Sequence, residues 1–67
     1  MMTMAQIIKN IQADAEEVFY DAILNARDKA DVVLILDCKQ RIDKPKGRSL
    51  REIRQNLGIL KCYAERE

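Results

Sequence analysis

The chain of 67 residues contains no histidine and no tryptophan, and its aromatic side chains number only one Phe and two Tyr. Histidine is the usual proton carrier near neutral pH, so acid–base catalysis would fall to a strongly perturbed carboxylate, lysine or cysteine. The sequence shows no glycine-rich phosphate loop, no nucleophile placed beside a base and no cluster of metal ligands. We therefore expect a protein that is not an enzyme and that uses no cofactor, metal or small-molecule substrate.

Cysteine is equally scarce, with only Cys38 and Cys62. Two thiols cannot form a disulfide scaffold, and they fall short of the four ligands that structural zinc requires. In a helical hairpin closed at Lys44 and Leu50, the two residues lie roughly 9 Å apart along the helix axis, whereas a disulfide needs Cα atoms within about 7 Å. We expect no intrachain bridge, leave a bridge between chains open, and interpret both thiols as small core residues.

Long apolar runs are also lacking. The longest, Val32–Leu36, is far shorter than the about 20 residues that a membrane-spanning helix needs. Near the N-terminus no basic segment precedes a long apolar one, as it would in a secretory signal, and Lys9 interrupts the apolar residues early. We expect a soluble, cytoplasmic protein with no membrane partner, and a single small helical domain over 1–67.

Apolar periodicity predicts a helix from the N-terminus onward. Thr3 followed by Gln6 fits a capping box. Apolar residues then recur at steps of three and four through about residue 27, and the same stripe continues through Ala30 and Val33.

A clear break follows, because Pro45 disfavours helix at the residue before it and Gly47 supplies turn freedom. Ser49 with Glu52 fits a second capping box and starts the last helix. Its apolar seam has the spacing of a surface that packs on another helix, and consists of Leu50, Ile53, Leu57, Leu60 and Ala64.

The run Val32–Leu36 admits two interpretations, because periodicity cannot separate a short buried strand from a helix buried on most sides. We favour a helix, since the apolar stripe continues into the run and no Gly or Pro intervenes before Pro45. Asp28 could cap a new start, giving helices over roughly 4–27 and 30–43. The alternative is an α-β-α chain whose strand 32–37 pairs with that of a second copy.

The predicted fold is all-α, with a long or bent N-terminal helix packed against a shorter C-terminal helix. One helix over 4–43 would be about 60 Å long, so the last helix would leave half of its apolar stripe uncovered. Either the long helix bends near Asp28 and forms a three-helix bundle, or a second copy covers the stripe. We predict the second arrangement, a homodimeric helical bundle, because the chain has more apolar residues than the main stripes account for: Ile35, Leu36, Ile59 and Tyr63 lie off them.

Charge is distributed unevenly, although the formal net charge is only +1. The segment 39–54 holds seven Lys and Arg against two acids, a net charge of +5, while residues 1–38 hold seven acids against three cations, a net charge of −4. A basic region of this kind attracts phosphates or an acidic protein surface.

Two short segments resemble known nucleic-acid-binding motifs. Pro45-Lys46-Gly47-Arg48 resembles the Pro-Arg-Gly-Arg core of AT-hook peptides, with Lys46 in place of the central Arg, and that resemblance implies contacts to the A·T minor groove. The segment 50–59 is similar to the first helix and turn of helix-turn-helix regulators, in which Gly58 would open the turn. Arg54 stands where that pattern has a small residue, and we favour one continuous helix.

Two classes of function follow from these features. In the first, a small regulatory protein contacts nucleic-acid phosphates through the basic residues Arg41, Lys44, Lys46, Arg48, Arg51 and Arg54. In the second, an interaction module, inhibitor or adaptor acts on a partner protein through its basic patch or an apolar helix face. Small phage or plasmid regulators are similar in size and composition. If these basic residues instead form ion pairs with the acids of residues 1–38, the second class is favoured. The acids in question are Asp14, Glu17, Asp21, Asp28 and Asp37.

Overall fold

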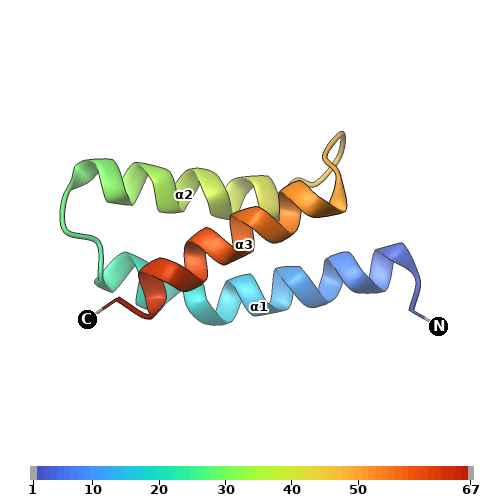
Figure 1. The fold of residues 1–67 in the computed structure, drawn as a ribbon, viewed down its shortest axis with the longest axis horizontal. Coiled ribbons are helices and arrows are strands. Elements are labelled where there is room, and N and C mark those ends of the chain that lie inside the picture. Colours follow the sequence, from blue (N-terminus) through green and yellow to red (C-terminus); the bar gives the residue numbers. More distant parts are fainter. Residues whose placement is uncertain (1, 67) are drawn as a thin grey trace.

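The computed structural model describes residues 2–66, which form three helices: α1 (Met4–Leu24), α2 (Lys29–Asp43) and α3 (Leu50–Ala64). Figure 1 shows α1 and α2 running along the length of the molecule with α3 lying across both. The all-α prediction is confirmed. The α-β-α alternative is wrong, because 32–37 lies inside α2 and residues 2–66 contain no strand. None of the helices in this range is both long and apolar enough to cross a bilayer.

Side-chain caps explain where the first two helices begin. The Thr3 hydroxyl accepts a hydrogen bond from the Gln6 N–H at 3.2 Å, and the Gln6 side chain accepts one from the Thr3 N–H at 3.3 Å, which confirms the capping box. Asp28 Oδ1 accepts from the Asp31 N–H at 2.9 Å and starts α2 as a separate helix. The chain therefore turns at 25–28 and forms three packed helices, while the homodimer stays a prediction.

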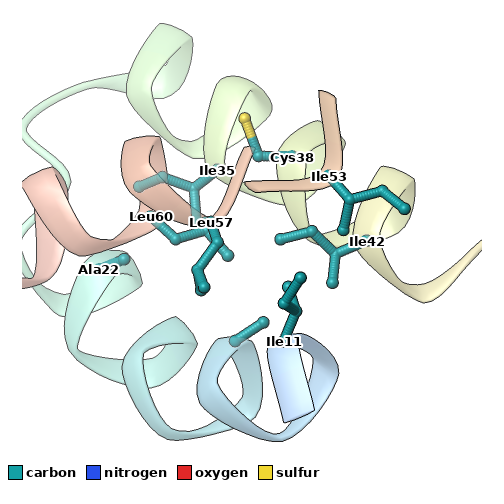
Figure 2. Packing of buried hydrophobic residues seen from close by; sticks show 9 residues of the cluster. Ile11, Ala22, Ile35, Cys38, Ile42, Ile53, Leu57 and Leu60 are labelled. Atoms are coloured by element: carbon teal, nitrogen blue, oxygen red, sulfur yellow. The ribbon is translucent and has the colours of Figure 1, made fainter. Parts of the chain in front are cut away.

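The core lies between the three helices, and Figure 2 shows how side chains from all of them meet there. Its buried members are Ile11, Ala15, Ala22, Ile35, Cys38, Ile42, Ile53, Leu57 and Leu60. From α2 the inward residues are Ile35, Cys38 and Ile42, at steps of three and four. Val33, expected to continue the apolar stripe of the first helix, is instead 57% exposed. The turn at 25–28 interrupts the helical phase, so α2 presents a different face to the core.

The two thiols lie in different surroundings. Cys38 is buried, and burial raises the pKa of its thiol. Cys62 is exposed on α3, so its assignment to the core is wrong. Both are free thiols, which agrees with the expectation that no intrachain disulfide forms.

Asp31 joins the start of α2 to the end of α3. Its carboxylate accepts hydrogen bonds from the Arg27 N–H at 3.0 Å, from Arg66 Nη1 at 2.9 Å and from the Tyr63 hydroxyl at 3.0 Å. The bond from the Arg27 backbone, and then that from Arg66, lower the pKa of Asp31 below its ordinary value. The same carboxylate raises the pKa of Tyr63.

This network predicts a pH dependence of stability. Because the pKa of Asp31 is lower in the folded protein, its contribution is present above the unfolded value of about 3.9 and is lost as pH falls through the folded value. We expect Asp31→Asn, which cannot titrate, to lose less stability than wild type between pH about 5 and 2 in urea unfolding followed by circular dichroism. Asp14→Asn is the control for the loss of one negative charge, because it removes an exposed carboxylate that makes no hydrogen bond within 2–66. Equal slopes for wild type and Asp31→Asn would contradict the prediction.

Candidate functional site

The basic residues predicted from the sequence gather at the end of the bundle that holds the α2–α3 turn. Figure 1 places this turn at the same end as the start of α1. That part of α1 adds no negative charge, because residues 4–13 contain Lys9 and no acid. The acids of α1 come later, with Asp14, Glu17 and Asp21 exposed at steps of three and four.

The turn itself is built by local hydrogen bonds. The Lys44 N–H donates to the Gln40 carbonyl at 2.9 Å and ends α2, and the Arg48 N–H donates to the Pro45 carbonyl at 3.0 Å. Gly47, third in this β-turn, has φ of 81°, which a type II turn requires at that position. The turn leaves the side chains of Lys44, Lys46 and Arg48 exposed.

The basic residues continue along one face of α3. The Ser49 hydroxyl accepts from the Glu52 N–H at 3.2 Å and starts the helix. The second capping box is only half formed, because within 2–66 the Ser49 N–H makes no bond to the Glu52 side chain. Arg51, Arg54 and Lys61 are exposed. Together with Gly58 they follow one another at intervals of three, four and three residues, which places them on one face of the helix. Sequence reasoning missed Lys61 because the charges of the C-terminal segment balance. Its spacing from Arg51 was the signal that could have placed it on this face.

Because α3 is continuous from Leu50 to Ala64, Gly58 lies inside a helix and opens no turn. The similarity to helix-turn-helix regulators therefore does not extend to the structure. The short resemblance to AT-hook peptides in 45–48 coincides with the exposed turn.

Two other cations of the basic segment are engaged by acids of the chain. Lys39 Nζ contacts Glu16 Oε1 at 2.7 Å and Asp43 Oδ2 at 2.6 Å, and its side chain is largely buried above the Phe19 ring. Burial alone would lower the pKa of Lys39, but the hydrogen bonds to Asp43 and Glu16 outweigh it and raise that pKa. Lys39 therefore holds α2 against α1.

Arg41, a predicted site residue, is also paired. Its Nη2 lies 2.9 Å from Asp37 Oδ2, one helical turn earlier in α2. The remaining five predicted residues and Lys61 differ from it, since none of their side chains forms an ion pair with any residue in 2–66. We call these six the basic surface: Lys44, Lys46, Arg48, Arg51, Arg54 and Lys61.

Comparison with known proteins adds no family or relative. No protein-family model matches the chain, and neither a curated protein nor a solved structure is significantly similar to it. The chemistry of the basic surface is therefore the basis on which function can be argued.

Proposed function

We propose that the protein is a non-enzymatic binding protein that contacts nucleic-acid phosphates through the basic surface. The observation that carries this proposal is the difference between two groups of cations. Lys39, Arg41 and Arg66 are neutralised by acids of the same chain, whereas the six cations of the basic surface are exposed and form no ion pair within 2–66. Exposed, unpaired Lys and Arg side chains release counterions when they neutralise phosphates, which supplies binding free energy.

The surroundings of these cations favour phosphates over an acidic protein. Protein–protein interfaces depend on buried aromatic or aliphatic anchors at their centre. The exposed large apolar residues of 2–66 are Met2, Met4, Tyr20, Leu24, Val33, Leu34 and Leu36, and none of them belongs to the turn or to α3. A surface that offers cations without an apolar anchor suits a partner that is bound through charge.

The same surface favours backbone contacts over recognition of bases. Proteins that bind single strands stack bases on exposed aromatic rings. The one aromatic residue of α3, Tyr63, donates its hydroxyl to Asp31 and has the Arg66 guanidinium 4.7 Å from its ring centroid. We therefore propose binding to duplex phosphates with little sequence specificity, which fits a small regulatory protein.

The proposal predicts a steep salt dependence. If four to six cations neutralise phosphates, the logarithm of the affinity for a generic duplex should fall with a slope of roughly −4 to −5 against the logarithm of salt concentration. Fluorescence anisotropy at several salt concentrations measures this slope. Absence of binding at low salt would overturn the proposal and would leave an acidic protein surface as the partner of these cations.

A matched pair of variants tests whether the basic surface is the contact. Arg48→Ala should lower the affinity for every duplex and reduce the salt slope by about 1, because one phosphate contact is lost. Arg41→Ala removes the same side chain from a residue that Asp37 already neutralises, so its slope should stay close to that of wild type. Equal slopes for the two variants would show that binding does not distinguish unpaired from paired cations.

A further inference from the structure

The outer face of α2 carries apolar side chains although neither of the other two helices of residues 2–66 covers it. A helix that is apolar on nearly all sides is normally buried. In the run 32–36 only Ile35 is fully buried by the bundle, whereas Val33, Leu34 and Leu36 are 57%, 40% and 49% exposed. A shallow depression on this face is lined by Lys29, Ala30, Val33, Leu34 and Asp37.

The charges along this face are arranged so that it complements itself. Lys29, Val33 and Asp37 follow one another at steps of four, which places a cation, an apolar side chain and an acid along one ridge of α2. When a second α2 runs antiparallel with the two Val33 residues at the centre, Lys29 of each copy faces Asp37 of the other. An interface with two-fold symmetry repeats each contact, so both ends of the ridge gain an opposite-charge pair.

We propose that a second copy of this chain occupies the outer face of α2, paired antiparallel about Val33. This inference does not depend on the proposed function. Asp37 keeps its pair with Arg41 at 2.9 Å in the single chain, and Lys29 of the second copy would extend that pair into a small network.

The exposed apolar side chains of this face are few, which indicates a small interface. They are Val33, Leu34 and Leu36, and each is only partly exposed. Small interfaces are typical of weak, transient association. The dimer should therefore be in reversible, concentration-dependent equilibrium with the monomer.

The antiparallel dimer would also fix the distance between the α2–α3 turns of its two copies. The consequence for nucleic-acid binding rests on the proposed function. Lys44 follows Val33 by 11 residues, or about 16 Å of helix. Two-fold symmetry then sets the turns roughly 33 Å apart, near the length of one duplex turn. Affinity for duplexes longer than one turn should exceed that for shorter ones. Self-association is measured without nucleic acid, so failure of this step and failure of the dimer are distinguishable.

Sedimentation equilibrium over a wide protein concentration range tests the dimer. Wild type should approach twice the monomer mass, and Val33→Lys should stay monomeric because it places two cations at the centre of the interface. Met4→Lys is the matched control, since Met4 is also 57% exposed but begins α1, away from the outer face of α2. Circular dichroism should show unchanged helix content in both variants. Wild type that remains monomeric throughout, or Met4→Lys that dissociates like Val33→Lys, would overturn the proposal.

A charge exchange tests the antiparallel register. Lys29→Glu and Asp37→Lys should each weaken association by about tenfold, because each turns two attractive pairs into repulsive ones. The double variant K29E/D37K reverses both charges and should associate more tightly than either single variant. Within one chain the two residues are eight positions apart and do not meet, so this rescue can arise only between copies. A double variant as weak as the weaker single one would overturn the register.

Discussion

Ile42→Ala is expected to leave a large share of the protein unfolded at 25 °C. Ile42 is completely buried, and Figure 2 shows its side chain among core residues from the other helices, close to Ile11 and Ile53. Truncation of such a side chain costs about 2–5 kcal/mol through lost burial and the cavity left behind. A core of this size rarely supplies more than about 3–5 kcal/mol in total, so the variant should have little stability left.

Urea unfolding followed by circular dichroism measures the loss, with Leu24→Ala as the matched control. Both substitutions remove three carbon atoms, but Leu24 is 63% exposed at the end of α1. Its truncation should change the free energy of unfolding by no more than about 0.5 kcal/mol. Similar losses for the two variants would mean that the three helices do not pack around Ile42 as the structure shows.

The parts of the fold that the sequence predicted are those with local causes. Thr3 with Gln6, and Ser49 with Glu52, marked the starts of α1 and α3, since caps depend on residues three positions apart. The break between α2 and α3 was equally visible, because Pro45 disfavours helix at the residue before it and Gly47 can adopt the positive φ that the turn requires.

The orientation of α2 could not be predicted in this way. The residues 25–28 contain no Gly or Pro, and the single indication of a break was the capping residue Asp28. If the apolar stripe of α1 continued unbroken through residues 25–28, Val33 would point into the core. In the structure α2 is a separate helix, so Ile35 is buried in the core and Val33 is exposed. Which side of an apolar run is buried depends on tertiary packing, and a run apolar on most sides gives no local preference.

The basic surface likewise combines features that are visible in the sequence with features that only tertiary packing decides. Sequence reasoning found five of its six residues, because charge density is visible without a fold. Lys39 belongs to the basic segment 39–54 but was not among the predicted site residues, and it is neutralised partly by Glu16, which only the packing of α1 on α2 brings near. The pair between Arg41 and Asp37 has a spacing of four within one helix and was open to prediction once the run 32–37 was assigned as helix.

Asn25→Asp is expected to destabilise the fold strongly, although it exchanges only an amide NH₂ for an oxygen. Asn25 follows the last residue of α1, and its Nδ2 donates to the carbonyl oxygens of Tyr63 and Ala64, each at 3.0 Å. These carbonyls belong to the last turn of α3, where the N–H groups of a following helical turn are missing, although the Tyr63 carbonyl also accepts from the Arg66 N–H at 3.2 Å. A carboxylate cannot donate, and its charge would face the negative end of the α3 dipole.

The loss of two hydrogen bonds at about 0.5–1.5 kcal/mol each, together with up to about 1 kcal/mol of repulsion, gives an expected cost of roughly 1–4 kcal/mol at pH 7. The introduced carboxyl group can donate only when protonated, so the folded state should raise its pKa and part of the stability should return as pH falls toward 4. Asn10→Asp makes the same exchange at an exposed residue of α1 with no hydrogen bond from its side chain within 2–66, and should change stability little. If urea unfolding at pH 7 found the two variants equally stable, the amide of Asn25 would not be what holds the end of α3 to α1.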